Sequence, residues 1–269
     1  TDSATSKTMT AVGNAQIDTA QYKFGTASGL FDGTGDYLTT PDHADFAFGA
    51  GDFTIDFWVR FDSVAAGRGF FEQQVDANNL WYLYWDGTNI IWSSVSASSS
   101  VGYFTAPWTP VLNTWYHVVF VRNSATTYIF VIGTAFSVTT GTAWGTVPDL
   151  AAVLNVGYVA NVNKYMSGWI DEVRISKGIA RWTANFTAPT KPYGSGPTHC
   201  LAYDYVNKSF WPWDNMNFQG SCLADDGTGQ RKIYVQALSY AYKFLSGNND
   251  DGTAINAYWT SKKLDIQNI

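Results

Sequence analysis

The sequence contains little charge, and most of that charge is negative. Only 14% of its 269 residues are charged, and 16 lysines and arginines stand against 22 aspartates and glutamates, which gives a net charge of −6. Proteins that bind nucleic acid normally present a basic face to the phosphates, so we expect no nucleic-acid partner. No apolar run reaches the roughly 18 residues that span a membrane as a helix, so we expect no membrane span.

Glutamate, histidine and cysteine are also scarce. The only two glutamates, Glu72 and Glu172, lie far apart in the chain, whereas glycoside hydrolysis needs a close pair of carboxylates. No Gly-x-Ser-x-Gly motif occurs, and the three histidines have no recognised metal-ligand spacing. The sequence therefore predicts a protein that is not an enzyme. Two cysteines, Cys200 and Cys222, are too few for a disulfide scaffold; one disulfide and two reduced thiols both remain open.

Aromatic residues are abundant instead, at 17% of the chain. They suit the half-buried surface of a β-sheet, and no helix-period segment of useful length occurs. The tripeptide Asp-Gly-Thr, whose Asp-Gly tolerates the positive φ of tight hairpins, occurs at 32–34, 86–88, 226–228 and 251–253. Short strands joined by tight turns are therefore predicted along the whole chain.

The segment 53–61 alternates with the period of a β-strand. The residues that we expect to face a core are Phe53, Ile55, Phe57, Val59 and Phe61. The other face carries Asp56, Trp58 and Arg60, and we expect it to stay free, as one face of a sandwich sheet often does; Asp56 and Arg60 are interpreted as surface residues. His117 lies within an apolar strand, which favours a buried imidazole with its hydrogen bonds satisfied.

Residues 128–132 are apolar on both faces of a predicted strand. A strand of this kind is typical of the centre of a sheet that is buried on both sides.

Residues 80–92 are interpreted as a hairpin around an Asp-Gly turn. A two-residue turn would place Trp81 opposite Trp92, and a four-residue loop would place Leu83 opposite Trp92. In both registers Trp92 joins the face of Trp81. A three-residue loop would move Trp92 to the face of Tyr82, so the register stays open.

Four segments stand in the order of a known family's signature blocks: FDGTGDYL at 31–38, FTIDFWVR at 53–60, NTWYHVVFVR at 113–122 and GWIDEVRISKG at 168–178. Together they resemble a laminin-G-like, concanavalin A-type jelly roll. The Ser-Lys-Gly and Ala-Arg-Trp that follow the last block resemble the form common in phage virion proteins. The resemblance implies a jelly-roll sandwich that binds and does not catalyse.

The predicted fold class is all-β, in two parts. A concanavalin A-like jelly-roll domain occupies residues 1–193, a linker follows at 194–197, and a small antiparallel β module occupies 198–269. The linker sequence Gly-Ser-Gly-Pro is typical of a domain connection. Four or five predicted strands in the last segment match the content of one propeller blade, and the segment resembles blade-like repeats of phage tail and collar proteins.

Exposed aromatic rings are the main candidate binding feature, because sugars stack their C–H faces on flat rings while polar neighbours fix the hydroxyls. The alternative is that these rings belong to the core, where aromatic side chains dominate burial. The candidate ligand-binding residues are Trp58, Tyr82, Tyr84, Trp108, Trp144 and Tyr165.

Calcium is the one candidate cofactor. It binds six to eight oxygens from carboxylates, carbonyls and water, and many jelly rolls of the resembled family hold one calcium ion. Asp32 and Asp36 flank a glycine-rich turn, and Asp171 lies in the last signature block. The alternatives are that Asp32 is only a turn residue and that Asp171 accepts backbone hydrogen bonds.

The composition and the resemblance favour a non-catalytic structural protein of a phage virion, in the tail, collar or a fibre. Its jelly roll would decorate the particle or bind carbohydrate on the host surface. Other virion proteins would be its partners, a homo-oligomer its state in the particle, and the virion its localisation after assembly in the host cytoplasm. The alternative is a carbohydrate-binding module of a secreted bacterial enzyme or adhesin.

Overall fold

The computed structural model describes residues 7–65 and 67–193 in full and, beyond them, the backbone of six strands between residues 199 and 262. The chain divides into two compact units, Thr1–Tyr193 and Gly194–Ile269. No helix in the described part of the chain has the length and apolarity needed to cross a bilayer.

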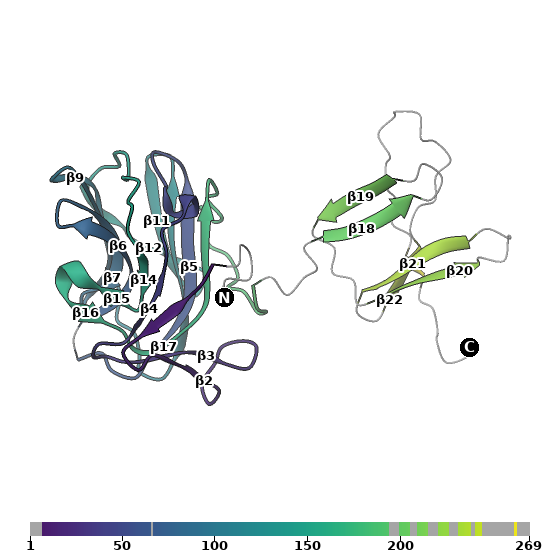
Figure 1. Ribbon diagram of the computed structural model, residues 1–269, viewed down its shortest axis with the longest axis horizontal. Coiled ribbons are helices and arrows are strands. Elements are labelled where there is room, and N and C mark those ends of the chain that lie inside the picture. Colours follow the sequence, from purple (N-terminus) through teal and green to yellow (C-terminus); the bar gives the residue numbers. More distant parts are fainter. Residues whose placement is uncertain are drawn as a thin grey trace. The chain divides into compact units, whose positions relative to one another are not determined.

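The first unit is a sandwich of two antiparallel sheets (Figure 1). One sheet has eight strands, in the order β1 (Thr10–Val12), β4 (Tyr37–Thr40), β14 (Leu154–Val156), β6 (Arg68–Asp76), β7 (Asn79–Trp85), β8 (Asn89–Ser96), β9 (Ser99–Pro107) and β13 (Thr139–Thr142). The other has seven, in the order β12 (Thr134–Phe136), β11 (Thr126–Val131), β10 (Trp115–Asn123), β5 (Phe53–Phe61), β17 (Ser167–Lys177), β3 (Ser28–Asp32) and β2 (Gln16–Asp18). A small hairpin, β15 (Tyr158–Val159) and β16 (Lys164–Tyr165), and two 3₁₀ turns, η1 (Ala44–Phe46) and η2 (Ala160–Val162), complete the unit. The all-β jelly-roll prediction is confirmed.

The second unit is described by its backbone alone. Strands β18 (His199–Asp204) and β19 (Ser209–Asp214) form one antiparallel pair. A four-stranded sheet contains β20 (Gly220–Asp225), β21 (Arg231–Ala237), β22 (Tyr240–Lys243) and β23 (Ser261–Lys262). The resemblance of this unit to a propeller blade stays a prediction, and so does the state of Cys200 and Cys222.

The core lies between the two sheets and is built on alternating strands. All five apolar residues of β5 that were predicted to face inward are fully buried. From the facing sheet, Phe70 and Phe71 approach Phe57 at ring-centroid distances of 5.0 and 4.9 Å. The alternation in the sequence therefore identified this face correctly.

The hairpin of β7 and β8 adopts the register with a four-residue loop, which pairs Leu83 with Trp92. Asp86 holds the loop, because its Oδ1 accepts the backbone N–H groups of Thr88 and Asn89 at 2.7 and 2.6 Å. Trp92 lies on the face of Trp81, as both favoured registers required, and their rings stack at 5.2 Å.

Most of the outer face of β5 is covered, because Thr54, Asp56 and Trp58 are buried there and only Arg60 stays partly open, so the prediction that this face stays free is wrong for most of its length. After β17 the chain turns back across the seven-stranded sheet as residues 179–193, which we call the C-terminal strap. Two hydrogen bonds from backbone N–H groups hold the strap on the sheet. The Arg181 N–H donates to Thr54 Oγ1 at 3.0 Å. Farther along the strap, the Phe186 N–H donates to Gly133 O at 2.9 Å. Asp56 beneath it is fully buried.

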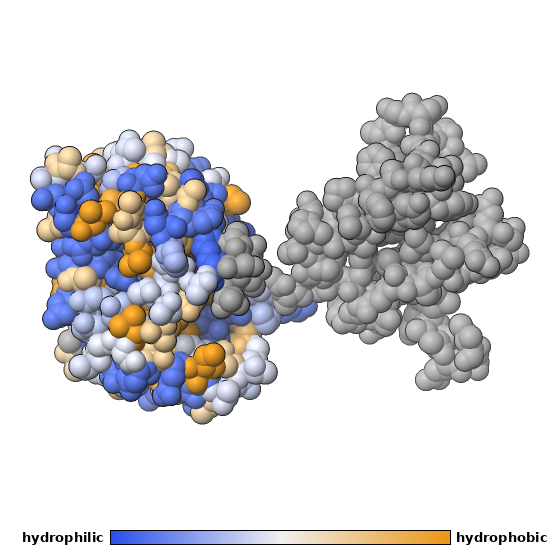
Figure 2. Space-filling model, viewed as in Figure 1, coloured by the Kyte–Doolittle hydropathy of each residue, from blue (hydrophilic) through white to orange (hydrophobic). Residues whose placement is uncertain are grey.

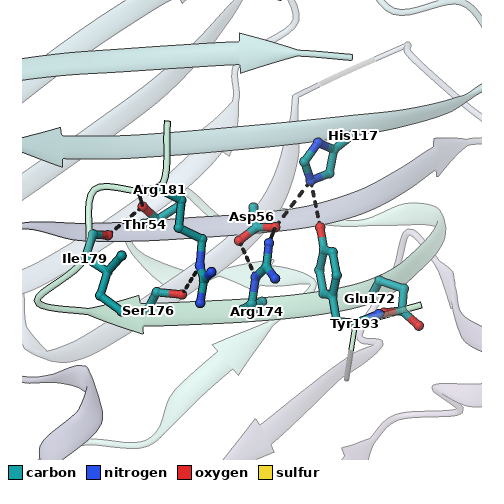
Figure 3. A network of polar contacts seen from close by, with 9 residues as sticks. All are labelled: Thr54, Asp56, His117, Glu172, Arg174, Ser176, Ile179, Arg181 and Tyr193. Carbon is teal, nitrogen blue, oxygen red and sulfur yellow. Dashed lines mark hydrogen bonds and ion pairs between the residues drawn. The ribbon is translucent and has the colours of Figure 1, made fainter. Parts of the chain in front are cut away.

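Asp56 is the centre of a polar network under the strap (Figure 3). Its carboxylate accepts Arg174 Nε at 3.0 Å and Nη2 at 2.8 Å, and His117 Nε2 lies 3.3 Å away. His117 Nε2 also lies 2.7 Å from the hydroxyl of Tyr193, the last residue of the strap. Burial opposes ionisation of Asp56, but the hydrogen bonds from His117 and Arg174 outweigh it and hold the pKa of this carboxyl below its usual value. His117 is buried as predicted, although its Nδ1 has no hydrogen-bond partner among the described residues.

The strap also explains the apolar residues 128–132. Strand β11 is an interior strand, second from the edge of its sheet, and pairs with β10 and β12, and Ile129, Phe130 and Val131 are buried on its two faces as predicted. Its inner face belongs to the core, and on its outer face Phe130 contacts Phe186 of the strap at 5.3 Å. The strap therefore supplies the burial of the outer face.

The surface of the first unit carries no dominant apolar area on the side that Figure 2 shows, where hydrophilic and hydrophobic patches alternate. Scattered apolar side chains of this kind are normal for a folded domain.

Candidate functional site

The outer face of the eight-stranded sheet carries a row of tyrosines and polar side chains. Strand pairing aligns one residue from each of six neighbouring strands along this row. In strand order they are Thr39, Asn155, Glu72, Tyr82, Ser93 and Tyr103.

Three tyrosines lie together over β7 and β9. Tyr82 is nearly buried, with 8% of its surface exposed, and its ring meets that of Tyr84 edge-on at 5.5 Å. Tyr84 and Tyr103 are half-buried. Burial raises the pKa of Tyr84 to about 12 and also raises that of Tyr103. Both hydroxyls therefore stay protonated near neutral pH and can donate as well as accept hydrogen bonds.

A second group of tyrosines gathers at the β15–β16 hairpin, which lies against β6 and β7 (Figure 1). Tyr158 and Tyr165 pair across the two strands and stack at 4.1 Å. Tyr37 of β4 approaches Tyr158 at 5.0 Å. Burial and the neighbouring hydroxyl of Tyr165 raise the pKa of Tyr158 to about 12. We call this surface, with Tyr37, Tyr82, Tyr84, Tyr103, Tyr158 and Tyr165, the tyrosine face.

Glu72 holds this hairpin in place. Its side chain is fully buried, and its carboxylate accepts the backbone N–H groups of Ala160 at 2.6 Å and Asn161 at 3.0 Å. These donors belong to the η2 turn between β15 and β16, which ends at Asn163 in the left-handed conformation. Burial raises the pKa of Glu72, although the two N–H donors oppose the shift.

The two glutamates do not form a catalytic pair. Glu72 lies on β6, whereas Glu172 lies on β17 of the other sheet. Glu172 sits in a bulge of β17 with φ of 51° and accepts the backbone N–H of Tyr193. Each carboxylate therefore serves as an acceptor that fastens a segment of the chain.

Of the six residues predicted to bind a ligand, three lie on the tyrosine face, namely Tyr82, Tyr84 and Tyr165. Sequence reasoning missed Tyr37, Tyr103 and Tyr158. For Tyr103 a signal existed, because Val101–Ala106 alternates and places Phe104 in the core with Tyr103 on the opposite side. Tyr158 lies in a strand of two residues, which shows no period.

The other three predicted residues lie elsewhere. Trp58 is buried on the seven-stranded sheet, where Lys23 Nζ lies 4.1 Å from the centre of one ring. Trp108 is buried in the core. Trp144 is half-buried against the core, and Arg122 covers its ring at 4.5 Å. None of these three rings offers a free face in this arrangement.

The three aspartates predicted to bind calcium are engaged by N–H donors. Asp171 Oδ2 accepts the backbone N–H groups of Lys23 and Phe24, and its Oδ1 accepts that of Glu172. Asp36 is buried and accepts the backbone N–H groups of Asn14 and Asp32.

Asp32 is exposed, and its Oδ1 accepts the N–H of Thr34 in the turn. Within residues 7–65 and 67–193 no three His, Cys, Asp or Glu side chains form a group that could hold a metal ion.

Solved structures with the same fold include two at TM-scores of 0.50 or above. Domain 4 of AbnA, a GH43 extracellular arabinanase from Geobacillus stearothermophilus solved in complex with arabinotriose, aligns at a TM-score of 0.50 with 20% identity over 64% of this chain and 82% of that one. A point mutant of HCR/D aligns at 0.51 with 12% identity over 88% and 68% of the two chains. At these identities the likeness shows the fold alone.

A comparison of sequences identifies the family. No curated protein is similar enough to count as a match. Residues 32–181, more than half of the chain, match the model of the concanavalin A-like lectin/glucanases superfamily. The four ordered sequence blocks, the two-sheet sandwich and this match agree, and the chain belongs to that superfamily.

Proposed function

We propose that the jelly-roll unit is a non-catalytic carbohydrate-binding domain and that the tyrosine face is its binding surface. The observation that carries the proposal is the gathering of six tyrosines on one sheet face, around a hairpin fastened by a buried glutamate. The five rings that are partly exposed, all but that of Tyr82, offer flat apolar surfaces of the kind that sugar C–H faces stack on, and the tyrosine hydroxyls, with Asn155 beside them, can bond to sugar hydroxyls. The fold supports the proposal, since domain 4 of AbnA was solved with arabinotriose.

We also propose that the chain is a structural component of a phage virion, in the tail, collar or a fibre, where it meets other virion proteins as a homo-oligomer. The support is the Ser-Lys-Gly and Ala-Arg-Trp pattern at 176–182 and the presence of a second β unit after the jelly roll. Detection of the chain in purified particles by mass spectrometry would agree with this; its presence only in the secreted fraction of a bacterium would contradict it.

The second candidate is a carbohydrate-binding module of a secreted bacterial enzyme or adhesin. The similarity to a domain of an extracellular arabinanase favours it. Binding of plant or bacterial polysaccharide together with covalent linkage to a catalytic domain would decide for this alternative.

The experiment that tests carbohydrate binding is a glycan array, read with purified wild-type chain and with Tyr103→Ala and Tyr165→Ala. We expect specific retention by the wild type and at least a tenfold loss of affinity, about 1.4 kcal/mol, in each variant. Tyr128→Ala, which removes a half-buried tyrosine of the other sheet, is the control and should bind like the wild type. Absence of any retained glycan, or equal binding by all variants, would refute the proposed face.

Calcium remains a prediction that the same array tests. One carboxylate oxygen of Asp32 accepts no N–H donor among the described residues. Asp32 is therefore the one of the three aspartates that could act as a calcium ligand. Binding that a chelator abolishes would support a calcium site, whereas binding that survives chelation would remove the metal from the proposal.

A further inference from the structure

The outer face of the seven-stranded sheet carries a second aromatic surface, beyond the part that the strap covers. Strand pairing places Arg60 of β5 directly between Trp115 of β10 and Trp169 of β17. All three side chains are half-buried and so partly open to solvent. We call them the Trp–Arg–Trp row.

Arg60 differs from the other arginines of the first unit. Its guanidinium lies 4.7 Å from the centre of the Trp169 ring, and within residues 7–65 and 67–193 it makes no hydrogen bond or ion pair. Each of the others donates to a carbonyl, a carboxylate or a hydroxyl; they are Arg68, Arg122, Arg174 and Arg181. Arg60 therefore keeps its hydrogen-bond donors available while an aromatic ring supports it on one side.

The two indoles flank Arg60 at a distance that suits a single sugar ring. Neighbouring strands lie about 4.8 Å apart, so residues two strands apart are separated by roughly 10 Å. The Trp169 ring is fixed, because its Nε1 donates to Asp18 Oδ2 at 2.7 Å. Trp115 is half-buried and its ring makes no aromatic or cation–π contact within the described residues, so part of the side chain is open to solvent.

The nearby carboxylates do not neutralise Arg60. Asp18 accepts the N–H of Ala20 and the indole of Trp169, and the hydrogen bonds lower its pKa so that it stays ionised. Asp62 accepts the hydroxyl of Ser167. Neither forms an ion pair with Arg60 in the described part of the chain, so the guanidinium of Arg60 is unpaired, while the carboxylate of Asp18 is bound to the indole N–H of Trp169. The positive charge of Arg60 complements an anion.

We infer that the Trp–Arg–Trp row is a second binding site, which takes a carboxylated sugar residue of the uronic or sialic acid class. The planar guanidinium of Arg60 matches a carboxylate with two parallel hydrogen bonds, and the exposed part of the Trp115 side chain accepts the sugar ring. The site lies on the opposite sheet from the tyrosine face. The two sites can therefore be lost independently, and neither depends on the other.

The test is isothermal titration of the full chain with acidic probes and their uncharged matches. The probes are 3′-sialyllactose against lactose, and trigalacturonic acid against its methyl ester. A charge-assisted carboxylate contact predicts that at least one acid binds the wild type at least tenfold more tightly than its uncharged match. Arg60→Gln should abolish this preference, and Arg60→Lys should keep part of it. Trp115→Ala should lower the affinity for the acidic probe, because it removes a ring on which the sugar packs. Tyr128→Ala, which removes a half-buried tyrosine outside both proposed sites, is the control and should leave the preference unchanged.

Three results would overturn the inference. One is a wild type that binds neither acid, or binds each no better than its uncharged match. Another is an Arg60→Gln protein, folded by circular dichroism, that keeps the preference. The third is displacement of the acid by inorganic phosphate at equal concentration, which would mean a site for simple anions and not for a sugar.

Discussion

Replacing Asp56 by alanine should destabilise the jelly-roll unit far more than a comparable change at the surface. The change removes both hydrogen bonds from Arg174 and the contact with His117. Breaking a buried ion pair by deleting one partner costs about 3–5 kcal/mol. Arg174 retains 26% exposure of its side chain and can be partly rehydrated, so we expect the lower end, about 3 kcal/mol. For a domain of this size that corresponds to a fall in Tm of roughly 6–12 °C.

The matched control is Asp45→Ala. Asp45 also forms an ion pair, with Lys7 at 2.6 Å; Lys7 is 11% exposed but the Asp45 side chain is 46% exposed, so water can replace much of this contact and we expect a loss of about 1 kcal/mol. Urea denaturation at pH 7, followed by tryptophan fluorescence, gives the free energy of unfolding of both variants. A loss at Asp56 no larger than the loss at Asp45 would show that the network does not stabilise the sheet and its strap.

The pH dependence of the same quantity has a definite sign. The pKa of Asp56 is lowered in the folded state, so its contribution is complete above the unfolded pKa of about 3.9 and is lost as the pH falls through the folded value. The wild type should therefore approach the stability of Asp56→Ala only in strong acid. Equal differences at pH 7 and at pH 2.5 would contradict this account.

Three further changes test the parts around the two faces. Burial raises the pKa of Glu72, so the folded chain binds this proton more tightly than the unfolded chain and stability should rise as the pH falls from 7 through the folded pKa; the urea midpoint of Glu72→Gln should show a smaller rise. Gly69→Ala should displace the β15–β16 hairpin and weaken glycan retention, because the added Cβ would lie 2.2 Å from a backbone oxygen of that hairpin. Its control is Gly51→Ala, whose Cβ meets only a contact of 3.4 Å and which should change neither glycan retention nor the urea midpoint. Tyr193→Phe removes the hydroxyl that contacts His117, which is worth about 1 kcal/mol, and should speed tryptic cleavage after residue 181 in the strap without changing the fold measured by circular dichroism.

The inward faces of the strands could be predicted from the sequence because they depend on local period. Phe53 to Phe61 alternate over nine residues, and a half-buried strand has no other way to place five apolar side chains on one side. The register of the β7–β8 hairpin could be narrowed but not fixed, since the choice rested on how Asp86 bonds to its own loop. These hydrogen bonds depend on the position of individual atoms, which the hydrophobic pattern of the sequence does not give.

The outer faces could not be predicted in the same way. Asp56 is buried by Tyr193 and its strap, which come from more than a hundred residues later and have no period of their own. A charged residue on an alternating strand normally indicates solvent, and only the pairing of Asp56 with Arg174 across β5 and β17 reverses that reading. The apolar outer face of β11 was the one sequence signal of the covering segment. Its cause is the contact of Phe130 with Phe186 of the strap.

The same reasoning separates the two candidate surfaces from the many aromatic residues that only fill the core. In this fold a ring binds a ligand only if it points outward on a sheet and no other segment of the chain covers it. Trp58 meets the first condition and fails the second, because residues 23 and 24 lie over it. Tyr84, Tyr103 and Trp115 meet both. A family match identifies the sheets, but which outward ring stays open is decided by the segments that cross each face, and these are the strap on one sheet and the glutamate-fastened hairpin on the other.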